Sequence, residues 1–219
     1  MKIALINENS QAPKNALIYD ILNEEARKAG HTIVNSGHTI VNYGMYGDED
    51  PHRLTYVQNG LLASILLTSK AADFVITGCG TGQGAMMACN AFPNVLCGRV
   101  ANPLDAYLFG QVNDGNCVAM PFAQDFGWGA EINLRYTFEK LFSEPFGGGY
   151  PKERAAAEQA NKKILDEVKA ITNRSLIDIL HDIDQDFLKS TIDYPQFKEQ
   201  FFSACKDPEI ADYLNSVLA

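Results

Sequence analysis

Four glycines within seven residues, at positions 78, 80, 82 and 84, constrain the fold of this chain more than any other feature. They follow the apolar run 74–76 and precede residues 85–88, which favour a helix. This order predicts a strand, a tight loop and a helix. Glycine lets a loop backbone approach a ligand closely, and the first amide groups of a helix favour negative charge. The loop is therefore predicted to bind a ligand.

The same alternation of strand and helix recurs along the chain. Apolar strands are predicted at 2–6, 95–100 and 116–120, and a tandem repeat over 31–44 supplies another strand from one of its two copies. Helices are predicted between the strands and after the last strand. The helix after the last strand, over 125–142, contains the only tryptophan. This alternation predicts a doubly wound, Rossmann-like α/β sandwich of three layers with a five-stranded parallel sheet. Ligands bind such sheets beyond the carboxyl ends of the strands.

Three glycines at 147–149 interrupt this pattern. From about residue 161 the chain has the pattern of short helices with many apolar side chains. We therefore predict an α/β domain over residues 1–160 and a C-terminal helical extension over 161–219. The apolar residues of the extension predict packing against the core or against another subunit.

Composition limits the classes of partner. The net charge of -9 and the isoelectric point near 4.9 argue against binding of nucleic acid or anionic membranes, which requires a basic surface. Five cysteines without the spacing of a disulfide framework indicate a reducing compartment, and no apolar segment is long enough to cross a membrane. A cytoplasmic protein is predicted. The four histidines show no ligand spacing, so neither a metal nor a cofactor is expected.

Cys79 and Thr81 bring reactive side chains into the glycine-rich loop. A thiol near a helix N-terminus ionises more readily, and its thiolate can act as a base or a nucleophile. The alternative for Cys79 is a small buried side chain that packs the loop. The hydroxyl of Thr81 can donate to a ligand oxygen or cap the helix. Core packing is the interpretation for the remaining cysteines, Cys89, Cys97, Cys117 and Cys205.

Residues 80–85 also match a loose dinucleotide-binding pattern. The pattern follows the third predicted strand rather than the first. The next strand leads to Asn102 instead of the acidic residue that would hold a ribose. An enzyme that uses a nicotinamide cofactor is therefore the lesser alternative.

The segment Cys79-Gly80-Thr81-Gly82, followed in order by 113–116 (Asn-Asp-Gly-Asn), resembles the family of ribose-5-phosphate isomerase B and galactose-6-phosphate isomerase. The resemblance covers roughly residues 1–155. It implies that an aldose phosphate and a ketose phosphate are interconverted through a cis-enediolate, without a metal. It also implies a homodimer with its active sites between the subunits.

The resemblance further implies a role for each matched residue. Cys79 would be the base that moves a proton between adjacent carbons, while Thr81 and the amides of 80–84 would stabilise the enediolate oxygens. Asn113 would hold a substrate oxygen, and Glu8 matches an acid in the first loop of the family. The substrate-binding positions implied in this way are Glu8, Asn9, Gly80, Gly82, Gly84, Asn113 and Arg154.

Several positions depart from the family pattern. Val112 stands in place of the histidine that opens the sugar ring, and Asn9 replaces a histidine of the first loop. Arg154 matches one phosphate-binding arginine, whereas the other arginine positions hold Ala123 and Tyr150. Arg99, Lys152, Arg53 or His52 could compensate, although a solvated surface role is the simpler explanation for each.

Two interpretations within the family therefore stay open. The first is an isomerase of a small, even open-chain, sugar phosphate or a related hydroxy-carbonyl compound. The second is a non-catalytic or accessory member that binds a sugar.

Overall fold

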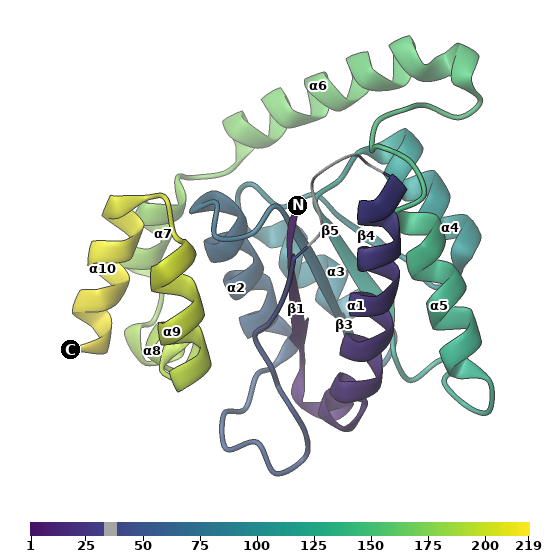
Figure 1. Cartoon of the computed structure of the whole chain (residues 1–219). Helices are drawn as coiled ribbons and strands as arrows, with labels where there is room; N and C mark the ends of the chain where they lie inside the picture. Colours follow the sequence, from purple (N-terminus) through teal and green to yellow (C-terminus); the bar gives the residue numbers. More distant parts are fainter. Residues whose placement is uncertain (33–38) are drawn as a thin grey trace.

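The computed structural model describes residues 1–32 and 39–219, and it confirms the predicted α/β sandwich with a helical extension (Figure 1). Within these residues, five parallel strands form one sheet in the order β2-β1-β3-β5-β4. The second copy of the repeat supplies β2, whereas residues 33–37 of the first copy lie outside the described residues. The strands are β1 (Lys2–Asn7), β2 (Thr39–Asn42), β3 (Phe74–Cys79), β4 (Cys97–Arg99) and β5 (Cys117–Pro121).

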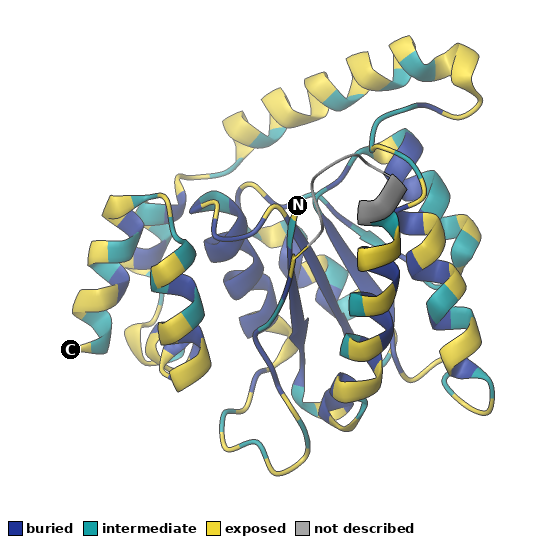
Figure 2. Ribbon diagram, viewed as in Figure 1, coloured by how far each residue is buried: buried dark blue, intermediate teal, exposed yellow. Residues whose placement is uncertain are grey.

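Helices cover both faces of this sheet, and the central strands β3 and β5 are buried along their whole length (Figure 2). Successive side chains of a strand point to opposite faces, so Ile3 and Leu5 of β1 join one core cluster while Ala4 and Ile6 join the other. The first cluster includes α1 (Asn15–Thr32), α4 (Pro103–Leu108) and α5 (Ala130–Leu141). The second cluster includes α2 (Tyr56–Thr68) and α3 (Gln83–Ala91).

The C-terminal helices pack against the outer side of α2, which confirms that the extension covers the core. Phe197 and Phe201 are fully buried there, with their rings stacked 4.7 Å apart. As a result, residues 58–67 of α2 are all buried. The helices of the extension are α7 (Leu176–Asp182), α8 (Gln185–Ile192), α9 (Pro195–Ala204) and α10 (Pro208–Leu218).

We expect Phe197→Ala to lower the free energy of unfolding by about 3–5 kcal/mol, because it removes a buried ring and leaves a cavity. Urea denaturation followed by circular dichroism measures this change. Phe202→Ala on the same helix is the matched control. Phe202 is only half-buried, so its truncation should cost less. Equal losses in the two variants would contradict the packing of the extension.

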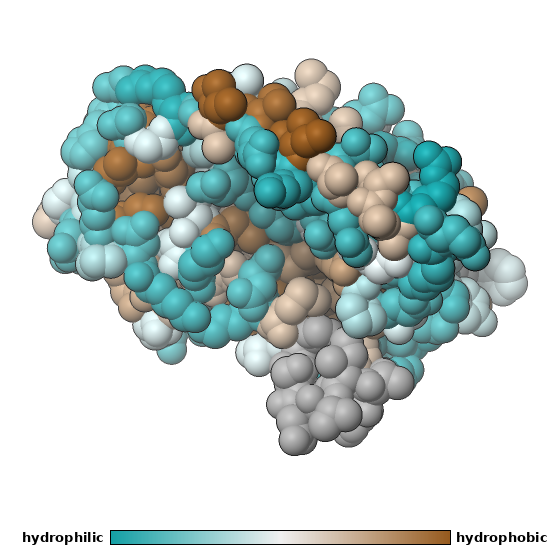
Figure 3. Space-filling model, turned by 90° about the horizontal axis from the view of Figure 1, so that it is seen from above, coloured by the Kyte–Doolittle hydropathy of each residue, from teal (hydrophilic) through white to brown (hydrophobic). Residues whose placement is uncertain are grey.

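The helix α6 (Ala155–Thr172) joins the two parts and runs along the outside of the molecule (Figure 1). The predicted domain boundary at residue 160 falls inside this continuous helix. The boundary stays a prediction. Hydrophobic side chains gather along the surface that α6 presents (Figure 3). No helix in the described part of the chain is long and apolar enough to cross a membrane. The exposed apolar residues of α6 are Ile164, Leu165, Val168 and Ile171.

The helix predicted over 125–142 starts later than expected, at Ala130. Gly129 precedes it with a φ of 83°, a left-handed conformation that does not continue a helix. Trp128, predicted inside the helix, lies in the preceding turn with its side chain fully exposed. Glycines on both sides of Trp128 thus shorten the helix.

Candidate active site

The carboxyl ends of the strands bring the first loop and the glycine-rich loop to one edge of the sheet. The register of β1 and β3 places Asn7 beside Gly78. The register of β3 and β5 places Cys79 beside Pro121. The loop at 8–9 therefore starts next to the loop at 80–84, as the rule for parallel sheets predicts.

The glycine-rich loop lies close against the end of β5. A Cβ atom at Gly78 would overlap the Met120 carbonyl and the Phe122 ring. Gly82 has a φ of 73°, and a Cβ atom there would lie 3.0 Å from the Ala119 carbonyl oxygen. Glycine is therefore required at both positions, because the backbone at the end of β5 lies too close for a side chain there. Gly82 also caps α3, whose first amide groups have no partner within the helix.

Cys79 and Thr81 differ in exposure although they are two residues apart. The Cys79 side chain is buried, with 8% of the residue exposed, whereas Thr81 is exposed. The Thr81 hydroxyl accepts a hydrogen bond from the Gln83 amide at 3.3 Å, so it takes part in capping α3. A hydroxyl that accepts can still donate, and Thr81 can therefore also bind a ligand oxygen.

Arg99 braces the glycine-rich loop from the end of β4. Its Nε donates to the Thr81 carbonyl oxygen at 2.9 Å, and its terminal nitrogen donates to Gln124 Oε1 at 2.6 Å. Arg99 is half-buried, so the simple solvated role does not describe it. Ala123, at one of the family arginine positions, also lies here, 3.6 Å from the position of a Cβ atom on Gly80. Arg99 thus supplies a guanidinium group at the carboxyl edge, where Ala123 stands in place of a family arginine.

A chain of hydrogen bonds leads from Glu8 through Ser10 to Gln11, which lies beside the glycine-rich loop. The buried Glu8 carboxylate caps the short helix that follows β1, accepting hydrogen bonds from the Ser10 amide at 3.0 Å and from the Ser10 hydroxyl. Gln11 Nε2 donates to Ser10 Oγ at 2.8 Å. Gln11 Nε2 also lies 3.9 Å from the Cβ position of Gly80. Glu8 is therefore a structural cap as well as a candidate ligand group.

Lys14 supplies a second cation at this edge, which the sequence analysis missed. Its Nζ donates to Gln11 Oε1 at 2.8 Å and to the Phe122 carbonyl oxygen, and it lies 4.5 Å from the centre of the Phe126 ring. Burial lowers the pKa of Lys14 from its ordinary value, because removal from water disfavours the charged form. The only sequence signal is its place one helical turn beyond the first loop.

The other candidate cations of this region, His52 and Arg53, lie on the loop between β2 and α2. The Asn9 amide holds this loop through a hydrogen bond to the Leu54 carbonyl at 2.7 Å. His52 stacks on Tyr194 with ring centres 3.9 Å apart, and burial is the main cause that lowers its pKa. Arg53 donates to a carbonyl of its own loop. Tyr194 of the extension thus contacts the His52 side chain, and a carbonyl of the loop binds the Arg53 side chain.

Asn113 and Arg154 lie away from Cys79 in the same chain. β5 begins at Cys117, which pairs with Val75 near the start of β3. Asn113 precedes β5 and therefore lies at the amino edge of the sheet, whereas Cys79 ends β3 at the carboxyl edge. Arg154 lies just before α6, and both Asn113 and Arg154 are exposed. One chain does not bring these two residues to the glycine-rich loop.

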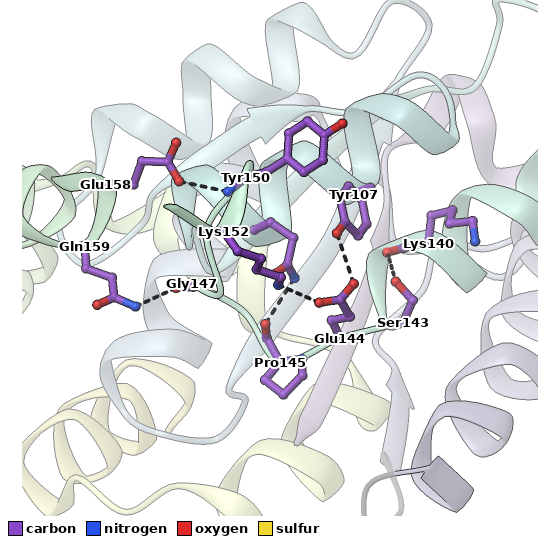
Figure 4. Close-up of polar contacts among 11 residues, drawn as sticks. Tyr107, Lys140, Ser143, Glu144, Pro145, Gly147, Tyr150, Lys152, Glu158 and Gln159 are labelled. Atoms are coloured by element: carbon purple, nitrogen blue, oxygen red, sulfur yellow. Dashed lines mark hydrogen bonds and ion pairs between the residues drawn. The ribbon is translucent and has the colours of Figure 1, made fainter. Parts of the chain in front are cut away.

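The segment that carries Arg154 is held by a polar network (Figure 4). Lys152 Nζ forms an ion pair with Glu144 at 2.7 Å and donates to Gln111 Oε1 at 3.2 Å. The Tyr107 hydroxyl donates to the same Glu144 carboxylate at 3.0 Å. The charge of Lys152 is thus engaged by Glu144 at the amino edge.

A cavity of about 760 Å³ lies at this amino edge, beneath α6. Its lining includes Asp114, Asn116, Lys162 and Lys169. The glycine-rich loop lies at the other edge, and there Thr81 is open to solvent. The candidate residues of the chain therefore fall into two groups, one at each edge of its sheet.

Comparison with known proteins agrees with this architecture. A model of the ribose/galactose isomerase family matches residues 3–157. A second family model, described as ribose-5-phosphate isomerase, matches residues 171–217 in the extension. The search of curated proteins gave no match.

Two of the similar solved structures cover the whole chain, and a third covers part of it. The crystal structure of a 4-deoxy-L-threo-5-hexosulose-uronate ketol-isomerase complexed with a tartrate is 60% identical, with a TM-score of 0.93, and covers 100% of this chain and 99% of that one. A ribose-5-phosphate isomerase from Vibrio parahaemolyticus is 50% identical, with a TM-score of 0.92 and the same coverage. The type B ribose 5-phosphate isomerase of Trypanosoma cruzi is 18% identical, with a TM-score of 0.59, covers 78% of this chain and 99% of that one, and supports the fold alone.

Proposed function

This chain belongs to the ribose/galactose isomerase family, and on that premise we propose that it interconverts an aldose and a ketose with Cys79 as the catalytic base. The observation that carries the proposal is the place of Cys79. It ends the central strand of the sheet, is buried, and stands beside a glycine-rich loop that leads into α3. A base in this position faces a substrate held by backbone amides.

The reaction requires one proton to move between adjacent carbons. The Cys79 thiolate takes the proton from the hydroxyl-bearing carbon, and the electrons of that bond form the double bond of a cis-enediolate while the carbonyl electrons pass to oxygen. The thiol then returns the proton to the former carbonyl carbon, and a proton passes from one oxygen to the other. Thr81 and the amides of 80–84 stabilise the charge that develops on the oxygens.

The other groups at this edge hold the substrate or the loop. Glu8 and Asn9, on the first loop, bind substrate hydroxyls, and the Glu8 carboxylate is kept in place by its own capping bonds. Arg99 is a positioning residue, because it holds the carbonyl of Thr81 and thereby the direction of the Thr81 side chain. Gly80, Gly82 and Gly84 leave room for the substrate beside these groups.

We place the substrate among hydroxy-carbonyl acids rather than cyclic sugar phosphates. The relative that is 60% identical over the full chain is a ketol-isomerase of a hexosulose-uronate, a name that specifies a carboxylate and no phosphate. Val112 can transfer no proton, so an open-chain substrate fits the chain better than one whose ring must be opened. Arg154 alone among the family's phosphate-binding arginines is kept, and one guanidinium group can bind a carboxylate through two parallel hydrogen bonds.

We expect kcat/KM for 4-deoxy-L-threo-5-hexosulose-uronate to exceed that for ribose 5-phosphate by about 10²-fold or more, because Val112 cannot open a ring and Ala123 and Tyr150 replace two phosphate-binding arginines. Steady-state kinetics with both substrates measures the ratio. Val112→His should raise the activity on ribose 5-phosphate without raising that on the uronate. Efficient turnover of ribose 5-phosphate by the wild type, unaffected by His52→Ala, would contradict this assignment.

The active species we propose is a homodimer with its sites between the subunits. Asn113 and Arg154 lie at the opposite edge from Cys79, so they reach the substrate only from a second copy. The exposed apolar face of α6 supports this arrangement, because a partner would cover it.

A non-catalytic sugar-binding member of the family is the second candidate. Val112, Ala123 and Tyr150, which stand in place of a histidine and two arginines, are the observation that favours it. Such a protein would be stabilised by a sugar ligand in a thermal-shift measurement without converting it.

A further inference from the structure

Three cysteines outside the proposed active site converge at the amino end of the sheet. Cys89 lies on α3, while Cys97 begins β4 and pairs in register with Cys117, the first residue of β5. Their sulfur atoms all lie within 4.8 Å of one another, and the Sγ atoms of Cys89 and Cys117 are 3.9 Å apart. All three residues are buried. Packing alone does not require three sulfur atoms to meet at one point.

We propose that Cys89, Cys97 and Cys117 form a binding site for a soft metal ion, with Cu(I) held by three thiolates as the occupant. An ion about 2.3 Å from each of three sulfur atoms in a plane needs those atoms about 4.0 Å apart. The Cys89–Cys117 distance of 3.9 Å already meets this requirement. Thiolate ligands select soft ions such as Cu(I) over the ions that prefer oxygen.

The number of ligands distinguishes Cu(I) from Zn(II). Among the described residues, the cluster holds these three cysteines and no histidine or carboxylate. Structural Zn(II) sites take four protein ligands, whereas Cu(I) is satisfied by three thiolates. The cluster therefore fits the ion that needs no fourth ligand.

A hydrogen-bonded frame fixes the least buried of the three cysteines. The Asn90 side chain accepts a hydrogen bond from the Cys97 amide at 3.0 Å and donates to the Cys97 carbonyl at 2.8 Å. Lys169 Nζ in turn donates to the Asn90 carbonyl at 2.8 Å. These bonds hold the backbone that carries the Cys97 thiol.

Lys169 also supplies positive charge beside the cluster. Its Nζ lies 2.8 Å from the carbonyl oxygen of Asn90, the residue that follows Cys89. Binding of Cu(I) releases three thiol protons to solvent and leaves a complex with two negative charges, which a nearby ammonium group offsets in part. Lys169 and Leu96, the residue before Cys97, line the 760 Å³ cavity beneath α6, so this cavity ends next to the cluster.

The test titrates the reduced, metal-free full-length protein with Cu(I), under anaerobic conditions and in competition with a chromophoric Cu(I) chelator. We expect one ion per chain. Cys97→Ser should weaken binding by about 10²-fold or more, since one of three ligands is lost. Cys205→Ser is the matched control, because Cys205 lies on the extension outside the cluster, and it should bind as the wild type does.

Two further measurements address the fold and the ligand set. Cu(I) should raise the melting temperature of the wild type and of Cys205→Ser but not that of Cys97→Ser. X-ray absorption on the wild type needs no variant and should find three sulfur neighbours at about 2.3 Å. Absence of saturable binding, equal affinity in Cys97→Ser, tighter binding of Zn(II) than of Cu(I), or a count of two or four sulfur atoms would each overturn the proposal.

Discussion

The Cys79→Ala variant is expected to lose about 10²–10⁴-fold in kcat, the contribution typical of a general base. The loss follows from the chemistry, because no proton leaves carbon without an acceptor at this position. The fold should survive, since the change removes a single sulfur atom next to a loop that is open to solvent. Steady-state kinetics on the uronate and on ribose 5-phosphate, together with circular dichroism, measures both effects.

Two comparison variants separate the base from its surroundings. Thr81→Val should lose about 10²-fold in kcat, as expected when one donor to a developing oxyanion is removed. Cys205→Ala, a half-buried cysteine of the extension, should retain wild-type kinetics. Retention of activity by Cys79→Ala would exclude Cys79 as the base, whatever the result at Thr81.

Coexpression of Cys79→Ala with Asn113→Ala is expected to restore activity that neither variant has alone. A mixed dimer would combine Cys79 of one copy with Asn113 of the other in one intact site and leave its second site without either. Random assortment makes half of the dimers mixed, so the total activity should reach about a quarter of the wild-type value. Differently tagged chains allow the mixed dimer to be purified and assayed separately.

The control for this experiment pairs two changes at the same edge of the sheet. Cys79→Ala and Thr81→Val both alter the glycine-rich loop, so in their mixed dimer each site carries one defect and none is intact. No restoration is expected there beyond the residual activity of Thr81→Val. Equal restoration by the two pairs, or none by Cys79→Ala with Asn113→Ala, would show that Asn113 does not act on the partner's Cys79.

The architecture was predictable because its signals are local. Apolar runs of strand length, glycines after β3 and the stripes of the helices each depend on neighbouring residues, and together they dictate a parallel sheet. The position of Glu8 at the same sheet edge as the glycine-rich loop follows from the same rule, since both loops leave parallel strands at the same end. The repeat left two equal candidates for β2, because its two copies differ at one position only and carry the same apolar pattern.

The rest of the candidate site depends on contacts between distant segments. Arg99 and Lys14 carry no motif, and their roles arise from the hydrogen bonds that they make to Thr81 and Phe122 after folding. Asn113 precedes its strand. The rule that ligands bind beyond the carboxyl ends of the strands therefore did not predict at which edge of the sheet Asn113 lies. The cluster of Cys89, Cys97 and Cys117 forms from three different elements, and the spacing of these cysteines in the sequence does not predict it.

The burial of α2 on every side has a consequence for how chains of this family can differ in length. A helix on the outside of a sandwich normally keeps a solvated face. In α2, residues 58–67 have none, because the extension occupies that side. The Trypanosoma cruzi protein covers only 78% of this chain and shares its fold. A chain with this fold but without such an extension is therefore expected to carry polar residues on the outer face of α2.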